Sequence, residues 1–164
     1  MKKLIPYLMA ALVGFAVFSC KDDDIDQDTF PIAIDLQNVD LENIDGVFQI
    51  SRAFTSSLYS SDVVLIFMQN GNISTGSPVW QAIPITFYLA DGHEVDYNYD
   101  FSKEDFVIYA GGTFDLTNTS YVKNKTFRIL IVPAATGKSA NVDLTDYESV
   151  INYFHIDDSN PTVL

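Results

Sequence analysis

The chain has 164 residues and a formal charge of −13, from 9 basic and 22 acidic side chains. So acidic a surface repels phosphate backbones and anionic lipid headgroups, which excludes nucleic acid as a partner and electrostatic docking to a membrane. The single cysteine, Cys20, excludes an internal disulfide and any zinc or iron–sulfur centre built on cysteines. The folded domain must therefore be stabilised by packing.

The first nineteen residues are typical of a secretory signal peptide. Met1-Lys2-Lys3 is a short basic segment, and residues 4–18 are almost continuously apolar. That stretch is shorter than the roughly 20 residues of a membrane-spanning helix, so a signal peptide over 1–19 is a better interpretation than a spanning or buried helix. Cleavage before Cys20 would leave 164 − 19 = 145 residues, enough for one domain with a real core.

The end of the apolar stretch resembles the lipobox of bacterial lipoproteins. Val17, Phe18 and Ser19 place an aliphatic, a tolerant and a small residue before Cys20. The resemblance implies that a diacylglyceryl group is attached to the thiol and that the chain is cut before it. Each buried CH₂ contributes about 0.8 kcal/mol, so two or three acyl chains hold a protein stably on a membrane. We expect Cys20 to be a lipid anchor; the alternative is an incidental free thiol.

The next residues indicate a destination. Lys21, Asp22, Asp23 and Asp24 resemble the export signal of surface lipoproteins in Bacteroidota, a lysine followed by an acidic run. This implies the outer membrane with the domain facing outward; the alternatives are a solvated linker and a domain facing the periplasm. Residues 20–29 would form a lipidated, extended acidic tether, because they have little to bury. As a whole, the chain resembles short, uncharacterised outer-membrane lipoproteins of Flavobacteria-type bacteria.

Residues 30–164 have the pattern of a single β domain. Runs rich in β-branched and aromatic residues are separated by Gly, Asn, Asp and Ser. We expect strands at 32–36, 47–54, 62–69, 106–110, 113–116 and 125–133, and a hairpin over 85–101. The runs 62–69 and 125–133 are apolar on both faces, which predicts central strands. The pattern favours a mainly β fold, an antiparallel β-sandwich of about eight or nine strands, immunoglobulin-like or similar.

The hairpin is predicted to turn through three residues, Ala90-Asp91-Gly92. A two-residue loop would pair Phe87 with Asp96, whereas a three-residue loop pairs it with Val95. Facing residues share a face of the sheet, so the apolar pairing is preferred. Gly92 would then adopt the left-handed conformation of a type I turn followed by a bulge.

The chain ends in a pattern of helical period. Thr145 and Glu148 fit a capping box, in which the threonine bonds forward and the glutamate bonds back. Apolar residues then recur at i, i+3, i+4 and i+7, namely Tyr147, Val150, Ile151 and Phe154. We expect a short helix over 146–154 that packs on the sandwich, and a tail that frays from Asp157.

Candidate chemistry centres on acidic residues near the hairpin. Asp96, Asn98 and Asp100 superficially resemble a calcium loop, but Phe101 replaces the glycine that such a loop requires. In a strand, their side chains would lie about 7 Å apart, too far for one ion. A solvated face is the better interpretation, and a weak calcium site near Asp96 and Asp100 stays open. We expect no metal site and no cofactor.

Other side chains give weaker signals. His93 and His155 are expected at the surface, and no Gly-x-Ser-x-Gly motif indicates a nucleophile. Arg52 and Arg128 are expected to pair with carboxylates, with anion binding as the alternative. Five aromatic residues could form a carbohydrate-stacking platform, although the predicted register turns two of them, Tyr97 and Tyr99, inward and one, Tyr88, outward. The five are Trp80, Tyr88, Tyr97, Tyr99 and Tyr109.

Together these features favour a lipid-anchored, non-enzymatic surface module that binds a protein or glycan partner. The alternatives are a small hydrolase that acts on glycans through an acidic pair, and a structural component of envelope assembly. Chains of this kind can carry the label dihydrolipoamide dehydrogenase. The sequence does not support that activity, because it has no Gly-x-Gly-x-x-Gly motif, no redox cysteine pair and too few residues for two nucleotide-binding domains.

Overall fold

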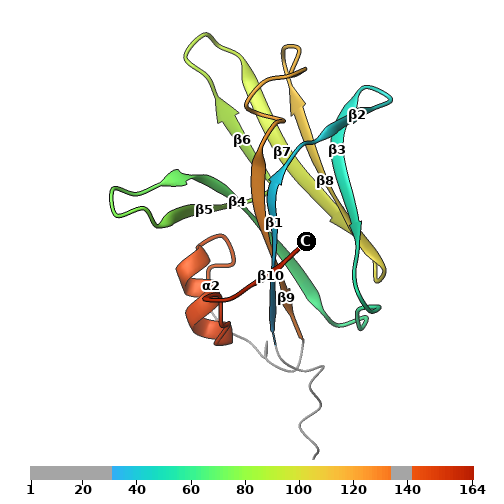
Figure 1. Cartoon of the computed structure of the whole chain (residues 1–164), viewed down its shortest axis with the longest axis vertical. Coiled ribbons are helices and arrows are strands. Elements are labelled where there is room, and N and C mark those ends of the chain that lie inside the picture. Colours follow the sequence, from blue (N-terminus) through green and yellow to red (C-terminus); the bar gives the residue numbers. More distant parts are fainter. Residues whose placement is uncertain (1–30, 134–141) are drawn as a thin grey trace, which may run out of the picture.

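The computed structural model describes residues 31–133 and 142–164, which form a β-sandwich of ten strands with one short helix (Figure 1). The elements are β1 (Ile32–Val39), β2 (Glu42–Ile44), β3 (Val47–Ala53), β4 (Val63–Asn72), β5 (Pro78–Ala82), β6 (Ile85–Tyr88), β7 (Glu94–Phe101), β8 (Asp105–Gly112), β9 (Lys125–Val132), α2 (Tyr147–Phe154) and β10 (Thr162–Val163). Sheet A has the order β10-β1-β9-β4-β5 and sheet B the order β2-β3-β8-β7-β6. The predicted mainly β sandwich is confirmed, and the strands β2, β5 and β10 are additional to those expected.

Sheet A is covered on one face by sheet B and over part of its other face by α2. Its central strands β4 and β9 come from the two runs predicted to be central. On the inner face, Ile66 and Ile129 are buried in the core between the sheets. On the outer face, Phe67 and Leu130 are buried with residues of α2. Strands apolar on both faces are typical of this doubly covered position.

The β6–β7 hairpin of sheet B has the predicted register. Phe87 pairs with Val95 and Ile85 with Tyr97. The Leu89 amide donates to the His93 carbonyl at 2.8 Å, which closes the three-residue loop. The turn requires a positive φ, and Gly92 adopts +84°. The expected side-chain directions are confirmed as well, because Tyr97 is buried and Tyr88 is 78% exposed.

The chain does not turn at Gly111 and Gly112, and the strand expected over 113–116 is absent. Instead β8 continues through both glycines. Both positions favour glycine, because neighbouring atoms occupy the space that a side chain would fill. A Cβ at Gly111 would lie 2.8 Å from the Asp96 carboxylate, and one at Gly112 would lie 3.0 Å from Leu116.

Helix α2 lies beside sheet A, below the β4–β5 hairpin (Figure 1). Its buried side chains are Tyr147, Val150 and Phe154, as the periodicity predicted. The predicted capping box is wrong. The N-cap is Asp146, whose carboxylate accepts from the Ser149 amide at 3.0 Å. The Thr145 hydroxyl instead donates to Asp143, two residues earlier.

The C-terminal tail is ordered, so the expected fraying from Asp157 is wrong. Ile156 is buried against the helix side of sheet A. Asp158 accepts a hydrogen bond from Arg128. Beyond them, β10 pairs in parallel with β1, and the Leu164 amide donates to the Asp35 carbonyl at 2.9 Å. These contacts hold a segment whose polar composition suggested a free end.

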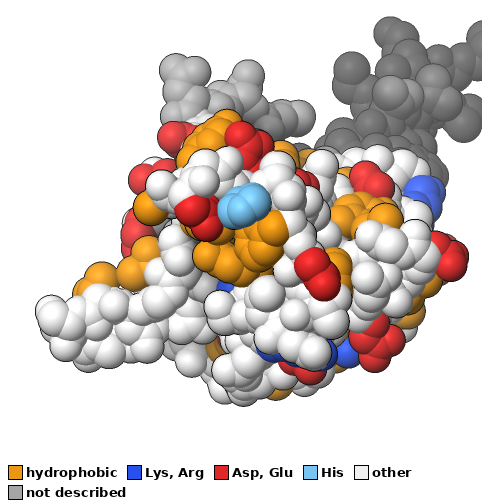
Figure 2. All heavy atoms as spheres, turned by 90° about the horizontal axis from the view of Figure 1, so that it is seen from above, with side chains coloured by type: hydrophobic (Ala, Val, Ile, Leu, Met, Phe, Trp, Pro, Cys, Tyr) orange, Lys and Arg blue, Asp and Glu red, His pale blue; other side chains and the backbone are white. Residues whose placement is uncertain are grey.

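The two ends of the sandwich differ. Strand β1 begins at the lower end in Figure 1, and the loops 89–93 and 113–124 lie at the upper end. Figure 2, a view of the upper end, shows hydrophobic side chains beside a histidine, with acidic side chains around them. In the described part of the chain, no helix is long and apolar enough to cross a membrane. The predicted signal peptide, Cys20 and the tether lie outside the described residues.

Candidate functional site

The outer face of sheet A has an apolar half and a polar half. The apolar half carries Phe67 and Leu130 and is covered by α2 and Ile156. The polar half is open and forms a hollow of about 360 Å³. The described residues that line this sheet A hollow are Asp35, Gln37, Asn38, Gln69, Asn72, Gly76, Pro78, Trp80, Thr126 and Arg128.

Arg128 is the central side chain at the boundary between the halves. Its Nε donates to Oδ1 of Asp35 at 2.7 Å, and its Nη2 donates to Oδ2 at 2.9 Å. Its Nη1 donates to the hydroxyl of Tyr147 and, at 3.1 Å, to Asp158. The Arg128 and Asp35 side chains are 8% and 5% exposed. A bidentate pair of this kind fixes the guanidinium plane as well as its position.

The network also fixes protonation states. Burial alone would lower the pKa of Arg128, but hydrogen bonds with Asp35 and Tyr147 raise it above its ordinary value. Arg128 is therefore a permanent cation. Burial and the hydrogen bond to Asp158 raise the pKa of Tyr147 above 10.0. The phenol therefore stays protonated near neutral pH and donates to Asp158.

Trp80 forms a wall of the hollow beside this network. The guanidinium carbon of Arg128 lies 4.5 Å from the Trp80 ring centroid, a cation–π contact. The Tyr147 ring centroid lies 5.7 Å from that of Trp80. The half-buried indole is thus held in one orientation by the helix and by the ion pair.

Amide and hydroxyl side chains form most of the remaining wall of the hollow. Gln69 Nε2 donates to Oδ1 of Asn72 at 2.7 Å. This bond leaves the Gln69 carbonyl, its second N–H and the Asn72 NH₂ to meet a ligand. Thr126 Oγ1 accepts a hydrogen bond from the backbone N–H of Asn38 at 3.3 Å. The site can therefore both donate and accept hydrogen bonds, and two of its amide side chains are already linked.

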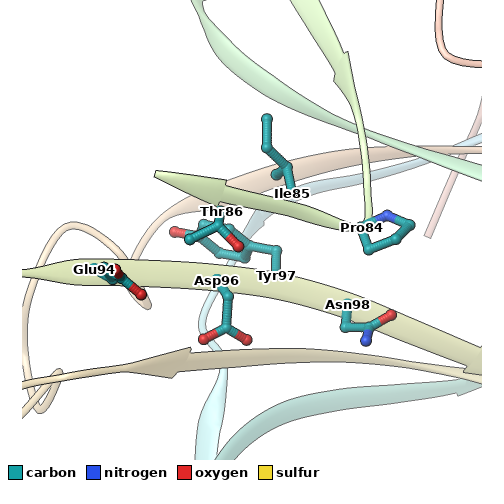
Figure 3. Close-up of a pocket in the computed structure, with 7 residues that line it drawn as sticks. All are labelled: Pro84, Ile85, Thr86, Glu94, Asp96, Tyr97 and Asn98. Carbon is teal, nitrogen blue, oxygen red and sulfur yellow. The ribbon is translucent and has the colours of Figure 1, made fainter. Parts of the chain in front are cut away.

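The predicted acidic residues lie elsewhere, on sheet B. Asp96 and Asn98 share one face of β7, as expected, and together with Glu94 they line a second hollow of about 380 Å³ (Figure 3). Figure 3 shows the Asp96 carboxylate directed toward the neighbouring strand, where Asp96 pairs with Gly111. Asp100 accepts a 2.8 Å hydrogen bond from the Tyr109 hydroxyl. No group of three or more acidic, His or Cys side chains that could hold a metal occurs among the described residues.

The two histidines are exposed, as predicted. His93 Nδ1 lies 3.2 Å from the Thr113 hydroxyl, and its ring lies 5.0 Å from that of Phe114. His155 forms the C-cap of α2 with a φ of 53°. Both contribute to local structure, and neither lines either of the two hollows.

Among the described residues, only one of the two arginines has the predicted carboxylate partner. Arg128 binds Asp35 and Asp158, whereas Arg52 donates to the Ser51 carbonyl. The pairing predicted for Arg52 is wrong as far as the described residues show. Arg52 follows the buried Ile50 on β3 at the end of the core, where its side chain reaches solvent and needs no counterion.

The proposed aromatic platform does not form. Tyr97 and Tyr99 donate to the carbonyls of Tyr121 and Val64, and burial raises the pKa of both. They belong to the core side of sheet B, as their predicted inward direction required. Of the five aromatic residues, only Trp80 lines the sheet A hollow.

Sequence reasoning missed Asp35, Asp158 and the linked amides of Gln69 and Asn72. Asp35 offered a signal, since a carboxylate inside the apolar run 32–36 needs a buried partner. Comparisons with protein-family models, with curated proteins and with solved structures found no match.

Proposed function

We propose that the chain is a lipid-anchored outer-membrane protein, exposed at the cell surface, whose sandwich is a non-enzymatic binding module. The ligand site is the sheet A hollow. The observation that supports the binding function is the hydrogen-bonded network around Arg128, which fixes one wall of the hollow before any ligand arrives. Side chains ordered in advance lose little conformational entropy on binding, which favours affinity.

The position of the hollow supports an anchored role. Strand β1 begins at the lower end of the sandwich, near the apolar half of sheet A (Figure 1). The hollow begins at Asp35, further along the same strand. A tether that precedes β1 would hold the helix-covered half toward the membrane and leave the hollow accessible.

The arrangement of carboxylates favours binding over hydrolysis. A glycosidase needs two carboxyl groups on opposite sides of the scissile bond. The only carboxylate that lines the hollow among the described residues is Asp35, and both its oxygens accept from Arg128. On sheet B, Glu94 and Asp96 project from one strand, and Asp96 lies against Gly111. Among the described residues, neither hollow presents a converging acidic pair.

The anchor is tested by expressing the chain and its Cys20→Ser variant in a bacterial host fed with a labelled fatty acid. We expect the wild-type chain to carry label, to sediment with the outer membrane and to bind antibody on intact cells. The Cys20→Ser chain should carry no label and should leave the membrane. A variant that stays in the membrane fraction would contradict the anchor.

Binding is distinguished from catalysis by incubating the purified full chain, in detergent micelles, with oligosaccharide and peptide libraries. We expect the protein to retain a ligand whose mass is unchanged after release. Turnover of a library member into fragments would favour the hydrolase, and retention of no member would contradict the binding function.

A further inference from the structure

We infer that the sheet A hollow binds an uncharged glycan, an inference that rests on the binding function proposed above. The hollow combines hydrogen-bonding groups of both kinds with one rigid aromatic wall. The described residues that line it offer no charge that is free to meet a charged ligand.

The charges of the hollow neutralise one another. Arg128 and Asp35 are the only charged side chains among the described residues that line it. Of the five N–H groups of a guanidinium, four are already bonded in Arg128. A carboxylate or phosphate on a ligand would therefore meet one N–H at most, too few for bidentate recognition. A ligand cation would have to compete with Arg128 for Asp35.

The charge of the chain adds to this selectivity. A formal charge of −13 repels acidic polysaccharides before they reach the surface. A neutral ligand avoids that repulsion. It also avoids the cost of burying a charge beside a pair that is already balanced.

The hydrogen-bonding groups suit hydroxyls. A sugar hydroxyl both donates and accepts, and neighbouring hydroxyls present the two functions side by side. The linked amides of Gln69 and Asn72 offer the same pairing, an acceptor carbonyl and free N–H donors. Because these amides already hold each other, a ligand need not order them.

The aromatic wall suits the C–H face of a sugar ring. Trp80 and Pro78 lie on β5, at one side of the polar surface. Trp80 cannot swing away, because Arg128 packs on the indole at 4.5 Å. A flat apolar wall beside amides is a suitable surface for a ligand with one polar rim and one apolar face.

An extended peptide fits the hollow less well. Peptides commonly bind sheets by adding a strand at a free edge. The lining side chains project from the face of sheet A, and of their strands β1, β9, β4 and β5 only β5 has an unpaired edge among the described residues. A peptide there would gain no backbone ladder, and the hollow has few apolar side chains to receive its own.

The test uses the full chain in detergent micelles, with affinity electrophoresis and calorimetry. The neutral probes are mannan, dextran, laminarin and galactomannan; the charged probes are polygalacturonate, heparin and chitosan, together with a peptide library. We expect a neutral polysaccharide to bind and the double variant Gln69→Ala/Asn72→Ala to weaken its binding about tenfold, since the hydrogen bonds of both amides to the ligand are lost. The matched control is Gln49→Ala on sheet B, which should bind like wild type.

The outcomes separate the inference from the proposed function. If a charged probe or a peptide binds and the double variant weakens it, the glycan inference is overturned and the binding function stands. If a neutral polysaccharide binds equally to wild type and the double variant, the hollow is not its site and the inference is overturned. If the double variant weakens the binding of no probe, both the glycan inference and the proposed binding function fail. A urea midpoint equal to that of wild type verifies that the double variant is folded.

Discussion

Arg128 binds Asp35 through two parallel hydrogen bonds, across 93 residues of sequence. The pair joins β9 to β1, next to the site where β10 pairs with β1. Through Tyr147 and Asp158 the same guanidinium reaches α2 and the C-terminal tail. One cation therefore links the sheet, the helix and the tail around the sheet A hollow.

Removing one member of this pair should be costly. Asp35→Ala leaves a buried cation without its main partner, and we expect the free energy of unfolding to fall by about 3–5 kcal/mol. Urea denaturation measures the loss. The double variant Asp35→Leu/Arg128→Met should lose less than Asp35→Ala, because no charge stays buried. Lys123→Ala, which removes an exposed ion pair with Asp40, is the control and should barely move the midpoint. An unchanged midpoint for Asp35→Ala would show that the pair is not buried in solution.

The Tyr147 hydroxyl should contribute separately from its ring. Tyr147→Phe keeps the edge-to-face contact with Phe67 at 5.2 Å but removes the bonds with Arg128 and Asp158. Because both partners are charged, we expect a loss of about 2 kcal/mol in urea unfolding. Tyr153→Phe, at an exposed position on the same helix, should have no effect. Equal stability of the two variants would contradict the network.

Stability should fall in alkaline solution. Burial raises the pKa of Tyr97 above 10.0, and burial with the Asp158 hydrogen bond does the same for Tyr147. Above pH 10 these tyrosines lose protons more readily in the unfolded chain, so the unfolded state is favoured as the pH rises. Their contribution is complete below pH 10 and declines above it. Urea midpoints between pH 9 and pH 11 measure the decline, which should be smaller in Tyr97→Phe. A midpoint that holds steady across this range would refute the raised pKa values.

The start of α2 depends on Asp146. Asp146→Ala removes the acceptor for the Ser149 amide, and we expect a loss of about 1 kcal/mol. Thr145→Ala should cost less, because the Thr145 hydroxyl bonds to Asp143 outside the helix. Thermal unfolding of the two variants decides between the observed cap and the capping box. A larger loss for Thr145→Ala would support the capping box.

The features of the fold that were predicted correctly are those determined by residues close together in the sequence. The hairpin register follows from alternation alone, since only a three-residue loop places Phe87 opposite Val95. The apolar periodicity located α2 in the same way. Its first residue was harder to predict, because Thr145 and Asp146 are both good capping residues. The choice depends on Asp143, which accepts the threonine hydroxyl.

The parts that were missed depend on distant residues. Asp158 lies in a polar tail that suggests solvent, and its partner is 30 positions earlier. Gln69 and Asn72 resemble ordinary surface residues at a strand end. They line a hollow only because α2 covers the apolar half of the face and leaves theirs open. No local pattern specifies which half a helix will cover.

The position of β1 has a mechanical consequence. From Ile32 to Leu36 it is hydrogen-bonded to the antiparallel β9, and β10 flanks its other side. A pull applied through the residues before β1 would run along the strand axis, so these bonds would be loaded together in shear and would not unzip one by one. The Asp35–Arg128 pair is a cross-link over the same interface. With the proposed anchor below and a ligand in the hollow above, drag on the ligand would pass across sheet A to β1 and on to the membrane without straining the second sheet.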